Sequence, residues 1–216
     1  MIEDGNREWV TVIRCICADG TWHPPTCIYK GTSSYFQENW IEGFDPVKYD
    51  CDFTTSPTGW TNDDLGYKWL LKFNERTKKK ARQAYRLLIL DGHGSHVTMK
   101  FINFCDMNRI ILGIYLPHST HTLQPLDIAL FRPLSQAYSE RLTAWIAKTE
   151  GFSNIQKRHF FTLFWPAWND SFTEENILLG FESTGINPFN LQCVIAKFEK
   201  KNRKKIGLLQ VNLFLP

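Results

Sequence analysis

The sequence lacks the long apolar runs that mark membrane and secreted proteins. No stretch of its 216 residues approaches the roughly 18 consecutive apolar residues of a membrane-spanning helix. Residues 1–5 are charged and lack the apolar segment of a signal peptide. We therefore expect neither insertion into a membrane nor secretion.

The six cysteines form no Cys-x-x-Cys pair, so the sequence does not predict a zinc site built from cysteine. Cys15 and Cys17 are two residues apart, and on a strand they would point to one face without easily bridging each other. Reduced thiols in an intracellular protein are the favoured interpretation.

Internal repeats and low-complexity linkers are also absent, which favours one ordinary domain. The chain is 43% hydrophobic and 22% charged, as is typical of a soluble globular protein. Its 16 Phe, 8 Trp and 7 Tyr supply ample bulk for a core.

The net charge of +3 is distributed unevenly along the chain. Residues 1–75 carry a net charge of −6, and residues 76–216 carry +9, with basic runs at 78–82 and 197–205. A basic half suits a polyanionic partner such as nucleic acid. A solvated helix face or a tail would explain either run alone. The second run also resembles a nuclear localisation signal.

The first third of the chain has the pattern of strands. Alternating β-branched and polar residues predict a strand over 9–18, followed by a turn at Asp19-Gly20. A returning strand is expected over 26–30, with its start delayed by Pro24 and Pro25.

The middle of the chain predicts a strand–helix–strand unit with a right-handed crossover. A separate helix, predicted over 62–77 from its periodic apolar residues, precedes this unit. Residues 87–90 are four consecutive aliphatics, as in a strand buried on both faces. Thr98 can cap a short helix, and a second buried strand is expected over 110–116.

The last part of the chain is expected to be helical. Pro125 suits the first turn of a helix, and Pro133 should kink that helix. Further helices are predicted near 155–169, 174–181 and 191–201. The predicted class is one α/β domain with a helical C-terminal third.

Two acids follow the predicted buried strands. Asp91 ends the first of these strands, where an α/β sheet presents its ligand site, and Asp127 lies in the first turn of the helix after the second. Converging carboxylates are what Mg²⁺ or Mn²⁺ requires. The structural alternative is that Asp91 is a polar strand terminus and that the helix dipole favours Asp127.

Four histidines lie beside these acids and offer a different kind of site. His93 with His96, and His118 with His121, form two His-x-x-His pairs in predicted loops. Four imidazoles could hold zinc, but no acid occupies a position typical of zinc proteases. Contacts to phosphate, or hydrogen bonds that hold a loop, are the more common use of such residues, and zinc is kept as the minor alternative.

Several motifs in fixed order carry a resemblance to a known family. The central ones are Leu90-Asp91-Gly92-His93-Gly94-Ser95-His96 and Leu116-Pro117-His118-Ser119-Thr120-His121-Thr122-Leu123-Gln124-Pro125-Leu126-Asp127. Flanking segments agree, at residues 5–11, 59–61, 131–134, 180–181 and 185–189. Over about residues 5–190 the chain resembles the DDE superfamily endonuclease domain of pogo/Tigger-like transposases of the mariner superfamily, in the form common in fungal genomes.

The resemblance implies an RNase H-like mixed sheet flanked by helices, in which three acids bind two Mg²⁺ or Mn²⁺ ions. Asp91 matches the second acid and Asp127 the third. The family's first acid lies on a central strand upstream of the segment that begins at Gly5, so the resemblance implies a domain over 5–190 that is truncated at its amino end. Residues 191–216 would be a basic tail.

Members of this family cleave DNA and transfer its strands in the nucleus. Without the first acid, catalysis by this chain is expected to be impaired. A non-catalytic DNA-binding or interaction domain derived from a transposase is the alternative function, and a homo-oligomer is left open.

Overall fold

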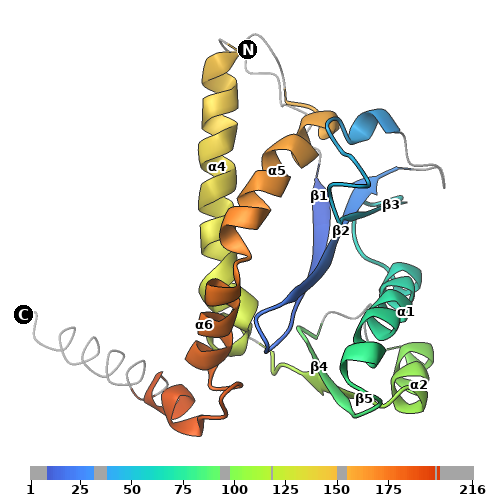
Figure 1. The fold of residues 1–216 in the computed structure, drawn as a ribbon, viewed down its shortest axis with the longest axis vertical. Helices are drawn as coiled ribbons and strands as arrows, with labels where there is room; N and C mark the ends of the chain where they lie inside the picture. Colours follow the sequence, from blue (N-terminus) through green and yellow to red (C-terminus); the bar gives the residue numbers. More distant parts are fainter. Residues whose placement is uncertain are drawn as a thin grey trace, which may run out of the picture.

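The computed structural model describes residues 9–31, 38–92, 98–117, 119–149, 155–197 and 199. These residues form a mixed set of strands with helices on both sides, as Figure 1 shows. The predicted α/β class, with a mixed sheet flanked by helices and a helical C-terminal third, is confirmed. The strands are β1 (Val10–Ile16), β2 (Trp22–Lys30), β3 (Asp52–Ser56), β4 (Arg86–Leu90) and β5 (Ile110–Ile114).

The strands form two separate sheets in the described residues. The first has the order β1-β2-β3, with β1 antiparallel to β2 and β3 parallel to it. The second consists of β4 and β5, which run parallel and are joined through the helix α2 (Met99–Met107). The predicted strand–helix–strand unit is therefore confirmed, and Thr98 caps α2 by accepting a hydrogen bond from Phe101 N at 3.2 Å.

The start of β2 differs from the prediction, because the strand begins before its prolines. Trp22 and His23 already pair with β1, while the register shifts so that Pro24 and Pro25 both lie opposite Arg14. Two residues facing one define a β-bulge, and proline is tolerated there because its missing N–H breaks no ladder bond. Pairing with β3 begins only at Thr26, so the prolines also lie outside that ladder.

The helix α1 (Asp63–Lys80) follows β3 and is capped at its start by Asn62. The Asn62 side chain accepts a hydrogen bond from Leu65 N at 2.9 Å, which satisfies one of the free backbone donors of the first turn. One face of α1 packs against β4 and α2. The predicted helix over 62–77 is confirmed, and it extends one turn further.

The remaining helical elements follow β5 without another strand in the described residues. They are α3 (Thr120–Leu123), the π-helical segment η3 (Leu126–Leu130), α4 (Phe131–Lys148), α5 (Lys157–Ser171) and α6 (Glu174–Thr184), and residues 191–197 are also helical. A short 3₁₀ turn, η1 (Glu38–Trp40), lies between β2 and β3.

The break that Pro133 was predicted to cause lies just before this residue. Pro133 has no N–H to donate to the carbonyl of Ala129, four residues earlier. The wider turn η3 occupies this stretch, and Phe131 N bonds to Leu126 O in place of an α-helical partner. The helix is thus widened rather than ended, and Pro125 lies at its start as predicted.

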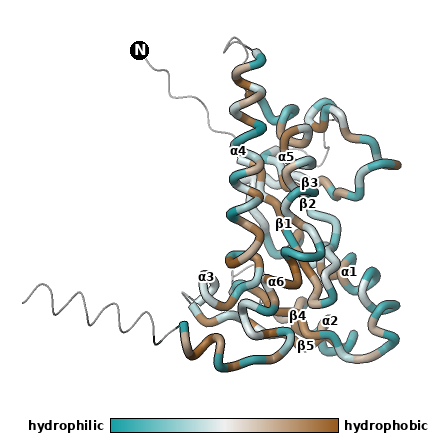
Figure 2. Tube along the Cα trace, turned by 60° about the vertical axis from the view of Figure 1, so that its left-hand side comes forward, coloured by the Kyte–Doolittle hydropathy of each residue, from teal (hydrophilic) through white to brown (hydrophobic). Residues whose placement is uncertain are grey.

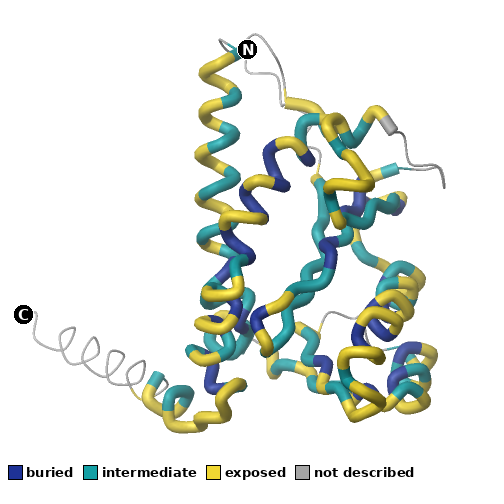
Figure 3. The backbone as a smooth tube through the Cα atoms, in the orientation of Figure 1, coloured by how far each residue is buried: buried dark blue, intermediate teal, exposed yellow. Residues whose placement is uncertain are grey.

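Two hydrophobic clusters hold the elements together. In cluster 1, α5 packs its buried side chains against β1 and β2, whereas α4 lies outside α5 and has no buried residue (Figures 1 and 3). Cluster 2 joins α1 and α2 to β4 and β5, and Figure 2 shows hydrophobic segments gathered around β1, β4 and β5. The buried members of cluster 2 are Leu70, Phe73, Leu88, Phe101, Cys105 and Ile110.

Candidate functional site

Asp91 lies directly after β4, at the carboxyl end of the parallel pair, and its side chain is exposed. Gly92 follows with a φ of +80°, in the left-handed region that favours glycine. A Cβ at Gly92 would also lie 3.2 Å from Ile114 Cγ2 of β5. The chain therefore turns sharply after Asp91 and stays close to the end of β5.

Asp127 lies in η3, and its side chain is half-buried. Its backbone N–H donates to Gln124 O at 3.1 Å. The carboxylate acts on two groups from other elements. Burial raises the pKa of Tyr115 to about 12, and the charge of Asp127 contributes to this shift. Burial lowers the pKa of Arg14, and the charge of Asp127 opposes that shift.

Tyr115 connects the two acids. It follows β5, and its backbone N–H donates to Leu90 O at 2.9 Å, directly before Asp91. Its phenol lies close enough to Asp127 for the carboxylate to shift its pKa. Tyr115 thus lies beside the residue that precedes Asp91 and within the field of the Asp127 charge. That they share a metal cluster stays a prediction.

Arg14 is a site residue that the sequence analysis missed. It lies on β1, its Nε donates to Val12 O at 3.1 Å, and its guanidinium lies 4.3 Å from the centre of the Phe131 ring. The available signal was a lone charge inside an otherwise uncharged strand, but that signal does not say which carboxylate the cation faces. Arg14 thus places a cation of β1 within the field of Asp127.

The four histidines are only partly covered by the described residues. His121 lies on α3 and is exposed. His93, His96 and His118 lie outside the described residues, so their expected clustering around the acids stays a prediction. The zinc hypothesis depends on these residues and likewise stays a hypothesis.

The carboxylates among the described residues can be compared with the ligands that a divalent metal ion needs. Two carboxylates suffice for one Mg²⁺, which commonly binds one or two of them together with water. In the described part of the chain, no group of three or more histidines, cysteines, aspartates or glutamates is arranged to hold a metal. The described residues therefore do not complete a two-metal cluster, and a single ion held by Asp91 and Asp127 stays a prediction.

A cleft of about 650 Å³ lies between β1 and β4 and is lined by Tyr115 at this site. Arg14 and Tyr115 line one end of this β1–β4 cleft, while Asp19 and Lys80 line the other. Lys80 forms an ion pair with Asp19 and donates to Thr21 Oγ1 at 2.7 Å. The cleft thus extends from Arg14 and Tyr115 to the turn that follows β1.

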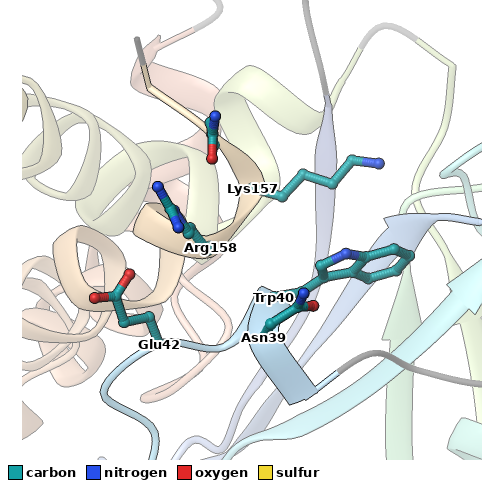
Figure 4. A pocket seen from close by; sticks show the side chains of 6 residues that line it. Asn39, Trp40, Glu42, Lys157 and Arg158 are labelled. Carbon is teal, nitrogen blue, oxygen red and sulfur yellow. The ribbon is translucent and has the colours of Figure 1, made fainter. Parts of the chain in front are cut away.

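A second cavity, of about 630 Å³, lies between η1 and the start of α5 (Figure 4). Lys157 Nζ lies 4.9 Å from the centre of the Trp40 ring and donates to Lys30 O at 3.2 Å. The Trp40 ring in turn stacks on Tyr29. Glu42 is the one acid among its described lining residues, so the cavity is better explained as the place where α5 is anchored to the sheet.

The mixed strands, the flanking helices and the acids after β4 and β5 define an α/β domain of the RNase H-like class. Within this class, the chain belongs to the DDE superfamily endonucleases. The sequence profile described as DDE superfamily endonuclease matches residues 6–181, which is most of the chain.

Curated relatives are similar to the same region. A Cochliobolus lunatus protein named MFS-type transporter clz9 is 37% identical over 198 residues, covering 92% of this chain and 21% of that protein. The human and mouse proteins named Pogo transposable element with KRAB domain are each 27% identical over 188 residues, covering 82% of this chain and 29% of the relative. The resemblance to pogo-like elements is confirmed.

The chain spans less than a third of the length of these relatives. Of these three relatives, only the Cochliobolus protein has a name that refers to transport. In the described residues, no helix is both long and apolar enough to cross a bilayer. No solved structure matches the chain.

Proposed function

We propose that this chain is a DNA-binding endonuclease domain of transposase origin, with Asp91 and Asp127 as its metal-binding acids. The observation that carries the proposal is that Asp91 ends β4 beside Tyr115, whose N–H donates to Leu90 O, and that the charge of Asp127 acts on the same tyrosine. Membership of the DDE superfamily endonucleases supports the same assignment.

A single Mg²⁺ or Mn²⁺ held by Asp91 and Asp127 would supply a Lewis acid for phosphodiester chemistry. The described residues supply no third carboxylate to this site, and the cation of Arg14 lies near Asp127 instead. A positive charge here weakens binding of a divalent cation. We therefore infer that cleavage by residues 1–216 alone is impaired.

The feature that supports DNA binding is a basic groove of about 590 Å³ at the opposite end of β4 and β5. Five of its described lining residues are basic and none is acidic: Lys78, Lys79, Arg82, Arg86 and Arg109. Arg86 is held by Asn108 O and by Thr77 Oγ1, the latter at 2.8 Å, whereas Lys78, Lys79 and Arg82 are exposed. These three exposed cations are suited to contact phosphates.

DNA binding is tested by replacing Lys78, Lys79 and Arg82 together with glutamine. Affinity for a DNA duplex should fall about tenfold or more at low salt. The slope of log K against log salt should become less negative by up to about 2.7, because each lost phosphate contact contributes about 0.9. Fluorescence anisotropy across a salt series measures both quantities.

A matched control removes the same charge elsewhere, by replacing Lys48, Lys68 and Lys148 with glutamine. If both triple variants lose affinity equally, binding reflects net charge and the basic groove is not the DNA-binding surface. If neither variant nor the parent binds DNA, the proposed function itself is wrong.

Cleavage is tested by incubating the purified chain with supercoiled plasmid and Mg²⁺ or Mn²⁺, beside the Asp91→Ala and Asp127→Ala variants. We expect no cleavage that depends on either acid. Cleavage that both substitutions abolish would show a working site and contradict the inferred impairment. Only acid-dependent cleavage would separate an endonuclease from the alternative function, a non-catalytic DNA-binding domain, for which no cleavage is expected either.

Residues 5–190 form the proposed endonuclease domain, and residues 191–216 form a basic tail. The protein is proposed to act in the nucleus. The family and the Pogo relatives support a DNA-acting protein. Localisation of a fluorescent fusion, with and without residues 191–216, tests whether the tail directs the protein to the nucleus.

A further inference from the structure

Two free thiols contact each other in cluster 1. Cys27 of β2 and Cys51, which lies directly before β3, have their sulfur atoms 3.8 Å apart. Both side chains pack in cluster 1, where Cys27 is fully buried and Cys51 is half-buried. Neither is bonded to another cysteine. The pair is therefore a dithiol with one buried and one partly exposed member.

The register of the sheet places the two cysteines on the same face. Cys27 lies opposite Phe53, and Cys51 is two residues before Phe53. Because side chains alternate between the faces of a strand, Cys27 and Cys51 are diagonal neighbours on one face. The thiol of Cys51 also donates to Pro25 O at 3.4 Å, which holds it against β2. The sulfur contact thus follows from the pairing of β2 with β3.

The two sulfurs are close enough for a bond after a small movement. A disulfide has its sulfurs about 2.05 Å apart, so they must approach by roughly 1.8 Å. Cys27 pairs with both β1 and β3, which fixes its backbone. Cys51 lies before Asp52, the first paired residue of β3, so no ladder bond restrains it. We therefore expect Cys51 to move toward Cys27, with β2 unchanged.

The two thiols differ in reactivity toward an oxidant. Burial and the contact with Cys51 raise the pKa of Cys27 well above its ordinary value, although the charge of Arg14 opposes this shift. A thiol with a raised pKa reacts slowly, because the thiolate is the nucleophile. Cys51 is the more exposed of the two. It is therefore the thiol that is oxidised first, and Cys27 completes the bond.

We propose that Cys27 and Cys51 form an oxidative modification site, at which hydrogen peroxide converts the dithiol into an intramolecular disulfide. First, the Cys51 sulfur attacks one oxygen of the peroxide, the O–O bond breaks, and a sulfenic acid forms with release of one water. The Cys27 sulfur then attacks the sulfenic sulfur, its S–O bond breaks, and a second water leaves. Two electrons pass from the sulfurs to the peroxide, and the two thiol protons end in the waters.

The disulfide would restrain the segment that connects β2 to β3. The two cysteines are 24 positions apart, and the chain between them carries η1 and the rings of Phe44 and Tyr49, which pack on α5. A bond across this loop reduces the conformational freedom of the unfolded chain. Oxidation should therefore raise the midpoint of thermal unfolding by several degrees.

This site does not rest on the proposed DNA function. Both sulfurs lie in cluster 1, and neither cysteine lines the basic groove. No DNA or metal ion is needed in the assays below, so their failure leaves the DNA-binding proposal intact.

The bond is read out by mass spectrometry after the whole chain has been treated with hydrogen peroxide. Free thiols are blocked with N-ethylmaleimide in denaturant. Digestion with trypsin and Asp-N then places Cys27 and Cys51 in peptides that hold no other cysteine. We expect these two peptides to be linked, and dithiothreitol to separate them. Absence of the linked pair, or a bond from either residue to Cys15 or Cys17, would overturn the proposal.

Three variants test the roles of the two thiols. Cys51→Ser should abolish the linked pair and the rise in thermal midpoint, whereas the matched control Cys193→Ser should leave both unchanged. In Cys27→Ser the sulfenic acid has no partner, so dimedone should label Cys51 at least tenfold more than in the parent. Circular dichroism checks that each variant is folded. Equal labelling of Cys51 in Cys27→Ser and in the parent would show that Cys27 does not consume the sulfenic acid, and would contradict the proposal.

Discussion

At the scale of single residues, Arg14 is the charge of β1 that lies in the field of Asp127. Its position opposite Pro24 and Pro25 interrupts the ladder, because prolines have no N–H to donate. A bulge of this kind re-aims a side chain. The guanidinium of Arg14 lies over the Phe131 ring and near the charge of Asp127. The Asp127 charge offsets only part of the cost of burial, because the pKa of Arg14 remains lowered.

The field of Asp127 gives a prediction for Tyr115. Burial first, and then the Asp127 charge, raises the pKa of Tyr115 to about 12. Replacing Asp127 with asparagine removes the negative charge that disfavours the phenolate, so the pKa of Tyr115 should fall but stay above its ordinary value, because burial is unchanged. Absorbance titration near 295 nm, with a Tyr115→Phe variant subtracted, measures the change.

Asp63→Asn is the matched control, since Asp63 lies in the first turn of α1, on another element. It should leave the titration of Tyr115 unaltered. An unchanged Tyr115 pKa in Asp127→Asn would mean that Asp127 does not face Tyr115, and the proposed acid pair would lose its geometric support.

At the scale of elements, an ion pair and a hydrogen bond join the end of α1 to the turn between β1 and β2. Lys80, in the last turn of α1, reaches both Asp19 and Thr21. Burial alone would raise the pKa of Asp19, but hydrogen bonds from Lys80 and Thr21 outweigh it and lower the pKa to about 2. The contact closes one end of the β1–β4 cleft.

This contact predicts a stability difference that depends on pH. The folded pKa of Asp19 lies below its ordinary value of about 3.9, so the stabilisation is present above pH 4 and is lost between about pH 4 and 2. Both side chains are nearly half exposed, which limits the pair to about 1 kcal/mol or less. Urea unfolding of the parent and of Asp19→Asn should differ at pH 6 and converge near pH 2. An equal difference at both pH values would assign the effect to the turn and not to the ion pair.

At the scale of the whole molecule, two hydrophobic clusters are built on separate sheets. Cluster 1 lies between β1, β2 and α5, whereas cluster 2 lies between α1, α2, β4 and β5. In the described residues no backbone ladder joins the two sheets. The two parts are therefore coupled through side chains such as Cys15 of β1, which packs on cluster 2.

This division predicts that damage to cluster 2 stays local. Phe101 is fully buried there, so Phe101→Ala should cost about 3–5 kcal/mol in free energy of unfolding. Hydrogen exchange should accelerate in β4, β5, α1 and α2, with little change in β2. Phe189→Ala is the control, because Phe189 is 83% exposed. Equal acceleration in β2 and β4 would show one cooperative unit.

The sequence by itself determined the local elements and the position of both acids along the chain. Thr98 caps its helix as predicted, and the aliphatic run before Asp91 forms the parallel strand that was expected. These features depend on neighbours within a few residues, where periodicity and capping leave a pattern. Membership of the DDE family was also readable, because several motifs occur in a fixed order.

Only the tertiary structure decided what lies opposite Arg14, which residue connects the acids, and that the strands divide into two sheets. Arg14 and Asp127 are more than a hundred residues apart, and Pro24 and Pro25 looked like a delay to β2 until their partner on β1 was known. Pairing between distant strands has no local signature, since an open edge and a paired edge have the same sequence pattern. For that reason the β1–β4 cleft, with its open backbone groups and apolar walls, is a property of the folded chain alone.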